Sequence, residues 1–490
     1  MNILNLFENT VENYKDKIAV CDDIEQLSFL KLKNESLKLA NTIKKINDTK
    51  DTPIGIFVNR KITSIISILA VLYSDNFYVP LDNKTPKEKL ESIIEETQMR
   101  IIIDLENENT QDLNVTLINK YDDEIGVYNL DDTNDKPLYM VYTSGSTGKP
   151  KGVLKSHDAM ISFIKTYIDK YQFDSNEIIG NQSPFFFDAA AKDLYLMMLA
   201  GSRMEIIPSR LFSYPYKLIE YLNQKEITFI SWVPSMLSII VKTNTFEDIM
   251  PTTLKKVFFV GESFPIKYLR KWLEALPNIK YVNLFGSSEI AGVFATYDIK
   301  EIKDDQLFLP MGKALDNCKV LLINDGNVLS EKEVLGEMYI SSDALALCYY
   351  KDEEKTNEKF IYANLDGQGT KRYFATGDIA KYDEEGNLVF VTRKDFQIKK
   401  MGHRIELGEI ESIANKCELI KQSCCVYLEE KQHLKLYCEV FDPQTSTKDI
   451  NVYLKEHLSD YMCPNKIIIM DELPLNANGK INRTYLKELR

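Results

Sequence analysis

The sequence predicts an α/β fold built from more than one subdomain, and three observations support this prediction. Residues 54–82 read as a short apolar strand, a helix-length amphipathic stretch and a second strand that ends in Pro80. Similar apolar runs, each next to a helical segment, recur further along the chain. A length of 490 residues also exceeds what one hydrophobic core fills. We therefore expect layers of helices and strands around at least two cores.

After the first strand–helix–strand unit, apolar strands next to helical segments continue, and the pattern then changes to short strands with turns. Further strands are predicted at "RIIIDL", "GSRMEIIP", "ITFISWVP" and "LKKVFFVGE". Between residues 318 and 391 the pattern becomes one of short strands with turn signals, in "CKVLLINDGNVL", "GEMYISS" and "YDEEGNLVFVTRK". This stretch predicts a β-rich subdomain.

A smaller α+β unit is predicted at the C-terminal end. It has a helix beginning near Glu406, strands at "SCCVYLEE" and "HLKLYCEVF", and a helix around "KDINVYLKEHL". A polar, glycine-containing loop, "LPLNANGKINR", leads into the last helix. We place the boundary near Asp395, which gives domains 1–394 and 395–490.

Composition limits the classes of partner. The formal net charge of −13 argues against nucleic acid or an anionic membrane as the main partner. The N-terminus lacks the basic start and apolar core of a signal peptide, and no run of about 18 apolar residues follows. The eight cysteines show no C-x-x-C spacing and read as reduced thiols. We expect a cytoplasmic protein with no membrane partner.

The stretch "YTSGSTGKPKGV", residues 142–153, has the parts of a phosphate-binding loop. It is not a Walker A loop, because Lys149 is followed by Pro150. Its glycines let backbone N–H groups approach an anion, its hydroxyls add donors and its lysines add charge. On these parts alone, an ordinary surface turn remains an alternative.

Further motifs accompany this loop in order along the chain: "FYVPLD", "FFFDAAAKDLY", "NLFGSSE", "FATGDIAKYDEEGNLVFVTRKDFQIKKMGHRIELGEIE" and "LPLNANGKINR". Together they span residues 77 to 483 and resemble the motifs of the adenylate-forming superfamily. Its members include adenylation domains of nonribosomal peptide synthetases, D-alanine–carrier protein ligases, acyl- and aryl-CoA synthetases and luciferases. The resemblance implies a large N-terminal adenylation domain, 1–394, and a small mobile C-terminal domain, 395–490, with a hinge at Asp395.

The reaction that the resemblance implies is attack of a carboxylate on the α-phosphate of ATP, which releases pyrophosphate and leaves an acyl-adenylate. Lys480 would bridge the substrate carboxylate, the α-phosphate and the ribose; otherwise it is a solvated lysine. Glu289 would hold Mg2+; otherwise it is an ordinary glutamate. Asp378 would accept from both ribose hydroxyls, and Arg393 would support the sugar or the phosphates.

The resemblance implies further nucleotide contacts. Phe285 would stack on adenine, although as an isolated aromatic it would be read as a core residue. With Asp378 and Arg393, the ATP-binding residues are then Thr143, Ser144, Gly145, Ser146, Thr147, Gly148, Lys151, Gly261, Glu262, Asn283, Phe285, Gly286, Ser287 and Ser288.

In the second half-reaction, the C-terminal domain would rotate about Asp395 and present another face to an incoming thiol. The segment around Lys399, Gly402 and His403 would then face the pantetheine channel. Lys480, Lys399 and Glu289 are thus the catalytic residues implied by the resemblance. His403 as a catalytic base is the weaker idea, because solvent or the adenylate can take the thiol proton.

Asp188 stands where amino-acid-activating members pair an aspartate with the substrate's α-ammonium, a charge that needs a carboxylate partner when buried. By the same resemblance the rest of the pocket is Ala189, Lys192, Ser231, Phe258, Val260, Leu284, Gly292 and Val293. The bulk of Phe258 and Leu284 favours a small substrate. Lys192 has three interpretations: a partner for an acidic substrate group, a partner for Asp193 or another pocket residue, or a solvated helix lysine. We favour a structural role for it.

We expect no carrier domain after Arg490 and no condensation domain before Met1. We therefore expect a stand-alone ligase that uses ATP and Mg2+, activates a small amino acid and loads a phosphopantetheinylated carrier protein in trans. An acyl- or aryl-CoA ligase is the first alternative. A nucleotide-binding module without turnover is the remote one.

Overall fold

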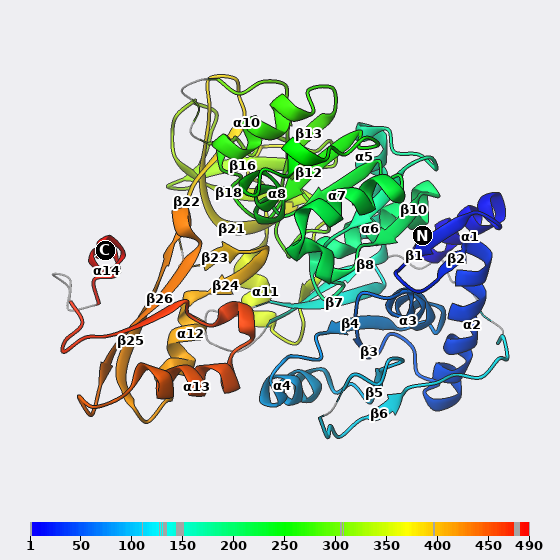
Figure 1. The fold of residues 1–490 in the computed structure, drawn as a ribbon, viewed down its shortest axis with the longest axis horizontal. Coiled ribbons are helices and arrows are strands. Elements are labelled where there is room, and N and C mark those ends of the chain that lie inside the picture. Colours follow the sequence, from blue (N-terminus) through cyan, green and yellow to red (C-terminus); the bar gives the residue numbers. More distant parts are fainter. Residues whose placement is uncertain are drawn as a thin grey trace. The chain divides into compact units, whose positions relative to one another are not determined.

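The computed structural model describes residues 2–109, 111–126, 128, 130, 135–143, 151–303, 306, 308–394, 397–474 and 481–489. The chain divides into two compact units. The first comprises residues 1–83, 97–141 and 152–394, and the second comprises residues 84–96, 142–151 and 395–490. Figure 1 traces the elements of both units.

Helices and strands alternate through most of the chain. The helices are α1 (Ile3–Tyr14), α2 (Phe29–Ile46), α3 (Ile62–Tyr73), α4 (Lys87–Thr97), α5 (His157–Tyr171), α6 (Asp188–Ala200), α7 (Pro215–Gln224), α8 (Pro234–Lys242), α9 (Thr245–Asp248), α10 (Ile266–Ala275), α11 (Glu353–Lys359), α12 (Leu407–Ala414), α13 (Thr447–His457) and α14 (Arg483–Glu488). The strands to residue 299 are β1 (Ile18–Cys21), β2 (Gln26–Ser28), β3 (Pro53–Phe57), β4 (Phe77–Leu81), β5 (Ile101–Ile103), β6 (Thr116–Ile118), β7 (Pro137–Thr143), β8 (Lys151–Ser156), β9 (Ile178–Asn181), β10 (Arg203–Ile206), β11 (Phe229–Trp232), β12 (Lys256–Val260), β13 (Lys280–Phe285) and β14 (Ala295–Ile299). The later strands are β15 (Lys313–Ala314), β16 (Cys318–Asn324), β17 (Asn327–Leu329), β18 (Gly336–Ser342), β19 (Cys348–Tyr349), β20 (Phe360–Ala363), β21 (Lys371–Tyr382), β22 (Leu388–Arg393), β23 (Gln397–Lys400), β24 (His403–Glu406), β25 (Ile420–Leu428), β26 (His433–Val440) and β27 (Lys466–Ile469).

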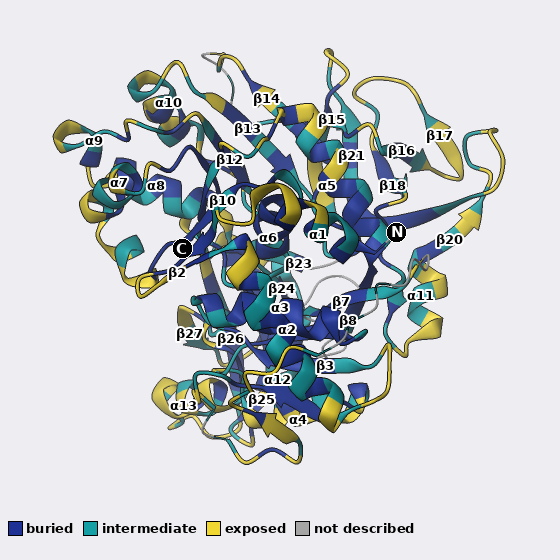
Figure 2. Cartoon of the chain, turned by 90° about the vertical axis from the view of Figure 1, so that its right-hand side faces the viewer, coloured by how far each residue is buried: buried dark blue, intermediate teal, exposed yellow. Residues whose placement is uncertain are grey.

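Within its described residues, the first unit holds two large sheets. One has the order β15-β14-β13-β12-β11-β9-β10-β1-β2, and the other has the order β19-β8-β7-β4-β3-β5-β6. Strands β9 to β13 run parallel to one another in the first sheet, as β3, β4, β5 and β7 do in the second. Parallel strands are joined through helices that cover the faces of the sheet, which leaves the strands buried. Figure 2 shows this burial, with exposed residues concentrated on outer helices such as α7 and α9.

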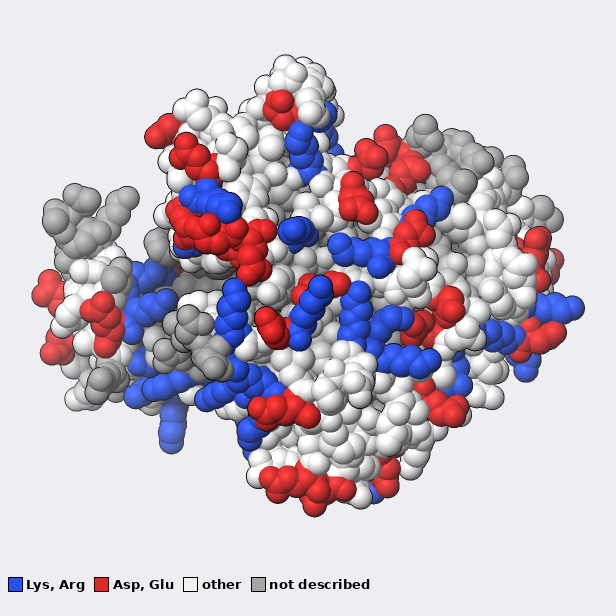
Figure 3. All heavy atoms as spheres, turned by 90° about the horizontal axis from the view of Figure 1, so that it is seen from above, with Lys and Arg blue, Asp and Glu red and all other residues white. Residues whose placement is uncertain are grey.

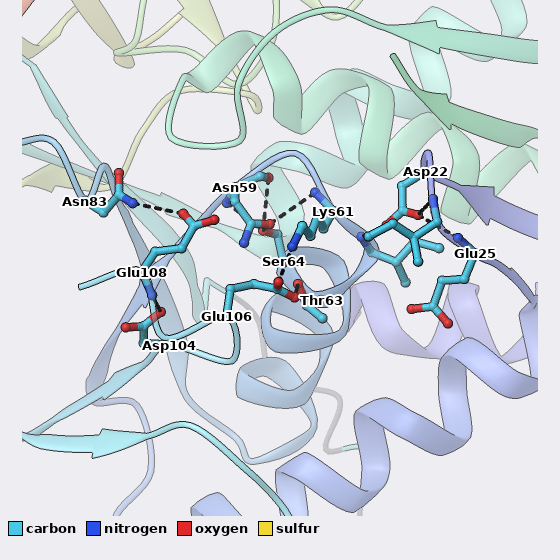
Figure 4. A network of polar contacts seen from close by, with 12 residues as sticks. Asp22, Glu25, Asn59, Lys61, Thr63, Ser64, Asn83, Asp104, Glu106 and Glu108 are labelled. Atoms are coloured by element: carbon cyan, nitrogen blue, oxygen red, sulfur yellow. Dashed lines mark hydrogen bonds and ion pairs between the residues drawn. The ribbon is translucent and has the colours of Figure 1, made fainter. Parts of the chain in front are cut away.

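The predicted strand–helix–strand unit of residues 54–82 is present as β3, α3 and β4, with β3 and β4 parallel. Helix α3 is buried along nearly its whole length. Its start has no side-chain cap of its own, and the Asp22 carboxylate instead accepts from the Ile62 backbone N–H at 2.9 Å. Lys61 pairs with Glu106, which also accepts from the Thr63 hydroxyl at 3.0 Å (Figure 4). Side chains distant in sequence therefore satisfy the donors that open α3.

The β-rich part of the first unit follows, as predicted for residues 318–391. Antiparallel strands form a sheet in the order β17-β16-β18-β21-β20, with β22 pairing with the long strand β21. In the second unit, β23 and β24 form a hairpin, and β25, β26 and β27 form a sheet that α12 and α13 accompany. The predicted mixed α/β class, with a β-rich subdomain and a small α+β C-terminal part, is confirmed.

On the face that Figure 3 shows, Lys and Arg side chains gather at the left and lower left, and side chains of both signs are interspersed elsewhere. In the described part of the chain, no helix combines the length and the apolar character needed to cross a bilayer.

Candidate active site

Asp188 opens helix α6, and its carboxylate is held by two buried side chains from neighbouring strands. Lys155 of β8 donates to both carboxylate oxygens at 2.6 Å. Tyr139 of β7 donates its hydroxyl to Asp188 Oδ1 at 2.7 Å. The Lys155 side chain is 0% exposed, whereas that of Asp188 is 18% exposed. The carboxylate is therefore anchored from behind and remains accessible on one side.

Lys155 makes a third contact, to the backbone oxygen of Ile290 at 3.1 Å. Complete burial lowers the pKa of Lys155, and the nearby carboxylates of Asp188 and Glu289 oppose that effect. The lysine thus connects the start of α6 with the segment that carries Glu289. A side chain with three donors on a compact head suits this position.

Glu289, the expected Mg2+ ligand, is completely buried. Its Oε1 accepts from the Tyr349 hydroxyl at 2.9 Å, and its backbone oxygen accepts from the Ala346 N–H at 2.9 Å. One carboxylate together with phosphate oxygens is a ligand set that Mg2+ accepts. Among the described residues, no three His, Cys, Asp or Glu side chains are grouped as a metal site. The donor set therefore fits an ion that binds together with a nucleotide.

The expected pocket residues of β11, β12 and β13 lie on one face of the sheet. Ser231 is in register with Phe258, and Val260 is in register with Leu284. Side chains alternate across a strand, so Phe258 and Val260 point the same way. Phe258 and Leu284 belong to the same hydrophobic core as most of α6. Ligands of parallel α/β sheets bind outside the carboxyl ends of the strands; Val260 ends β12 and Leu284 lies next to the end of β13, whereas Phe258 is in the middle of β12.

Ser231 and Phe258 are both buried, but only Phe258 has its full set of contacts within the described residues. Phe258 is buried among aromatic rings, with centroids 4.7 Å from Tyr171 and 5.1 Å from Phe229. The Ser231 hydroxyl is buried and has no hydrogen-bond partner within the described residues. Since a buried hydroxyl without a partner is costly, Ser231 is the polar group of this face that is available to a ligand.

Lys192 and Asp193 form a second buried ion pair on α6, with Nζ 2.5 Å from Asp193 Oδ1. Asn181 donates to the other carboxylate oxygen at 3.1 Å. Of the three interpretations of Lys192, the structure therefore shows the pairing with Asp193. Ala189 follows Asp188 in the first turn of the same helix and is partly buried.

The loop from Gly286 to Val293 is packed so closely that its glycines are required. A Cβ on Gly286 would lie 2.5 Å from the backbone oxygen of Gly292. Gly292 has φ of +70°, and a Cβ there would lie 2.2 Å from the Phe163 ring. Val293 is buried, while Ser287 and Ser288 are partly buried. The loop thus brings Glu289 and the two expected pocket residues Gly292 and Val293 against the core.

The residues expected at the adenine edge lie at the ends of β12 and β13. Asn283 donates its side-chain amide to the Pro310 backbone oxygen at 2.8 Å. The Glu262 carboxylate accepts from the Ser235 N–H at 2.9 Å, directly after Gly261, which has φ of +97°. The Phe285 ring lies 5.6 Å from Phe294 between ring centroids. A ring at the end of a strand can stack on a planar base.

The expected ribose residues, Asp378 of β21 and Arg393 of β22, face each other across the hairpin and form an ion pair. Arg393 also donates to the Thr376 backbone oxygen at 3.1 Å, and the Thr376 hydroxyl accepts from the Asp378 N–H at 2.9 Å. Glu337 accepts from the Gly377 N–H at 3.2 Å. Asp378 is therefore held in a fixed orientation by neighbours on both strands.

In the second unit, Lys399 lies on β23, opposite Arg404 of β24. Gly402, with φ of +81°, forms the turn of this hairpin. The His403 ring stacks on Tyr461 at 3.7 Å between centroids. Burial, with a smaller contribution from Lys400, lowers the pKa of His403 to about 3. A histidine with so low a pKa is a weak base at neutral pH.

Several expected site residues lie outside the described residues: Ser144, Gly145, Ser146, Thr147, Gly148, Asp395 and Lys480. The residues on either side of the phosphate loop are described. Thr143 ends β7 and Lys151 begins β8.

Four residues of these clusters were not predicted from the sequence. Lys155, Tyr139 and Tyr349 contact Asp188 or Glu289, and Glu337 contacts the turn before Asp378. Lys155 had a visible signal, because it is a charged residue in a strand whose other central positions are buried. The tyrosines had none, since buried tyrosines are common in strands.

Comparisons with known proteins show the family of the chain. Residues 7–350 match the AMP-binding enzyme family, and residues 409–480 match the AMP-binding enzyme C-terminal domain. The chain belongs to the AMP-binding enzyme family. It is 30% identical over 500 residues to zwittermicin A synthase ZmaJ from Bacillus cereus, and the match covers 99% of this chain and 94% of ZmaJ. It spans between 6% and 44% of the length of other curated synthases that it matches at 27% to 30% identity.

Solved structures show the same fold. A variant of o-succinylbenzoate CoA synthetase (MenE) from Bacillus subtilis has a TM-score of 0.87 at 20% identity, with 99% of this chain and 98% of that chain covered. PA1221, described as an NRPS protein with adenylation and PCP domains, has a TM-score of 0.85 at 20% identity, with 99% and 84% covered. The chain is thus an adenylate-forming enzyme of the nonribosomal-peptide-synthetase type.

Proposed function

We propose that this enzyme activates a small amino acid as its aminoacyl-AMP, with release of pyrophosphate, and then transfers it to the phosphopantetheine thiol of a separate carrier protein. The observation that carries the amino-acid part is Asp188. Its carboxylate is fixed at the start of α6 and its side chain remains partly exposed, while the buried residues further along α6 belong to the same core as Phe258 and Leu284 of the expected pocket. Such a carboxylate is the partner that a substrate α-ammonium requires when it leaves water.

The first half-reaction brings two anions together, because the substrate carboxylate attacks the α-phosphate. At 4 Å, their repulsion is roughly 4 kcal/mol at an effective dielectric constant near 20, so cations must be aimed at the reacting oxygens. ATP with Mg2+ supplies the phosphoryl group under attack and neutralises part of its charge. In this proposal Glu289 holds the ion, Lys480 bridges the reacting oxygens, and Asp378 with Arg393 orients the ribose.

The second half-reaction uses the 395–490 domain. Asp395 is the proposed hinge, and Lys399 is the proposed catalytic residue of the hairpin that presents Gly402 to the pantetheine arm. A glycine at this turn lets a thin chain pass close to the backbone. The similarity to PA1221, which contains a carrier (PCP) domain, supports a carrier protein as the acceptor.

Substrate-dependent ATP/pyrophosphate exchange tests the first half-reaction. The purified chain with Mg2+ is assayed across amino acids of both hands, β-alanine, and a set of aryl and fatty acids. We expect exchange with a small amino acid, and Lys480→Ala should abolish it while leaving the protein folded. Exchange restricted to acids without an amine would contradict the amino-acid assignment.

An acid–CoA ligase is the second candidate, and a specific observation favours it. Lys155 already supplies a positive charge to both oxygens of Asp188, so the carboxylate is neutralised before any substrate binds. MenE, which shares the fold, is described as a CoA synthetase. Thioester formation with free coenzyme A at the rate seen with a phosphopantetheinylated carrier would support this candidate.

A further inference from the structure

The pairing of Lys155 with Asp188 bears on which acids the pocket selects. Lysine is among the residues that are almost never completely buried without a partner, and Lys155 is 0% exposed inside a strand. It donates to three oxygens: both carboxylate oxygens of Asp188 and the backbone oxygen of Ile290. A lysine held this way is a fixed part of the site and not a side chain that swings to solvent.

The pairing with Lys155 changes the net charge that the α-substituent of a substrate would meet at Asp188. A lone buried carboxylate attracts an α-ammonium strongly, because each charge compensates the other. Here Lys155 occupies both oxygens and Tyr139 occupies one of them as well. An incoming ammonium must therefore share Asp188 with a lysine a few ångströms away, and the two like charges repel. A neutral hydroxyl can donate to the exposed side of Asp188 without that repulsion.

We infer that Lys155 is a specificity-determining residue that competes with the substrate's α-ammonium for Asp188, so that the pocket accepts small α-hydroxy acids alongside small α-amino acids. This inference rests on the proposed function, because it assumes that Asp188 faces the α-substituent. Nothing in the chemistry of adenylation requires an amine, since the reacting group is the carboxylate. The hydroxy acid is activated by the same step, with its carboxylate oxygen bonded to the α-phosphorus and pyrophosphate leaving.

The test compares matched pairs of acids in ATP/pyrophosphate exchange: glycine with glycolate, alanine with lactate of the same hand, and serine with glycerate. The quantity measured is the ratio of kcat/KM for the amino acid to that for its hydroxy partner. For the wild type we expect a ratio within about tenfold of one. Lys155→Met keeps an unbranched stem but removes the charge, and we expect it to raise this ratio at least tenfold, through a lower KM for the amino acid.

The chain offers a matched control. Lys256 forms a largely buried ion pair with Glu177 and is the first residue of β12, at the end of the strand opposite to Val260. Lys256→Met removes a largely buried, ion-paired lysine from the sheet that carries the β12 pocket residues, without touching the pocket, and the wild-type ratio should persist. In the double variant Lys155→Met/Asp188→Asn, the increase should disappear, because the effect of Lys155 passes through Asp188.

The outcomes separate the two proposals. An unchanged ratio in a folded Lys155→Met variant, or an equal rise in Lys256→Met, overturns the inference. If the wild type activates hydroxy acids alone and Lys155→Met gains amino acids, the competition of Lys155 for Asp188 is upheld, whereas activation of amino acids by the wild type is contradicted. If Lys155→Met does not fold, Lys155→Arg replaces it; its bulkier head must displace Asp188, and an unaltered ratio would then contradict the inference.

Discussion

Helix α6 contributes the aspartate to each of two lysine–aspartate pairs, which differ in how far the aspartate is buried. In Lys192–Asp193 both side chains are almost completely buried, at 3% and 1% exposure, and Asn181 completes the set. In Lys155–Asp188 the lysine is buried and the aspartate is 18% exposed. The first pair is closed on all sides by protein, and the second leaves one side of a carboxylate accessible.

This difference indicates separate roles for chemically identical groups. A buried ion pair adds little stability compared with apolar residues of the same size, but loss of one partner is strongly destabilising. The closed pair therefore has a structural role in fixing α6 against β9. In the open pair, Lys155 is likewise removed from water, and the exposed side of the Asp188 carboxylate is in addition available to a substrate.

The largest expected effect is on the closed pair. Asp193→Ala leaves Lys192 buried without its counter-charge, and we expect it to lower the free energy of unfolding by about 3–5 kcal/mol. Urea denaturation followed by tryptophan fluorescence measures this change. The double variant Lys192→Met/Asp193→Leu should recover most of the loss.

Asp188→Ala is the matched change in the open pair. We expect a smaller loss of stability than for Asp193→Ala, because water can enter from the exposed side and hydrate Lys155. Equal losses for the two variants would show that the pairs do not differ in the way described.

A third buried group sharpens the comparison, because the effect of burial on its pKa outweighs that of the charges near it. His157 lies two residues after Lys155, and its Nδ1 accepts from the Ile3 N–H at 3.2 Å. Burial lowers the pKa of His157 to about 4. Between pH 6.5 and pH 4 the unfolded chain takes up a proton that the folded chain refuses, so stability is complete above pH 6.5 and falls as the pH drops.

Because of this difference in pKa, His157 should lower the free energy of unfolding by about 2 kcal/mol between pH 7.5 and pH 5. His157→Gln keeps an acceptor for the Ile3 N–H, and it should remove the contribution of His157 to the pH dependence of the free energy of unfolding. Urea denaturation of both proteins at the two pH values measures it. His403, with a pKa of about 3, remains in both proteins, so its contribution cancels in the comparison. Parallel pH profiles would contradict the prediction.

The sequence predicted the closed pair as one alternative and did not predict the open one, for a physical reason. Lys192 and Asp193 are adjacent on one helix, so their pairing was among the interpretations that sequence allowed. Lys155 and Asp188 are 33 residues apart, on a strand and a helix, and only the fold brings them together. Asp188 itself was found by its motif, whereas the side chain that neutralises it carries no motif.

The fold was predicted more completely than the site. Strands β3, β5, β10, β11 and β12 and the helices of the C-terminal part begin and end close to the predicted segments, because their apolar periodicity is local. The short strands β6 and β15 and the sheet orders were not predicted, since they depend on which distant strands become neighbours.

The smallest expected effect concerns the second donor to the open pair. Tyr139→Phe removes the 2.7 Å hydrogen bond to Asp188 Oδ1 but keeps the ring, which stacks on Tyr78 at 5.3 Å between centroids. Lys155 still holds both oxygens, so we expect a stability loss of only about 0.5–1.5 kcal/mol. The freed lone pair of Oδ1 should favour a substrate ammonium, and KM for the amino acid should fall a few-fold while KM for the hydroxy acid changes little. ATP/pyrophosphate exchange measures both constants. A rise in both would mean that Tyr139 orients Asp188, and the competition for its oxygens would then be confined to Lys155.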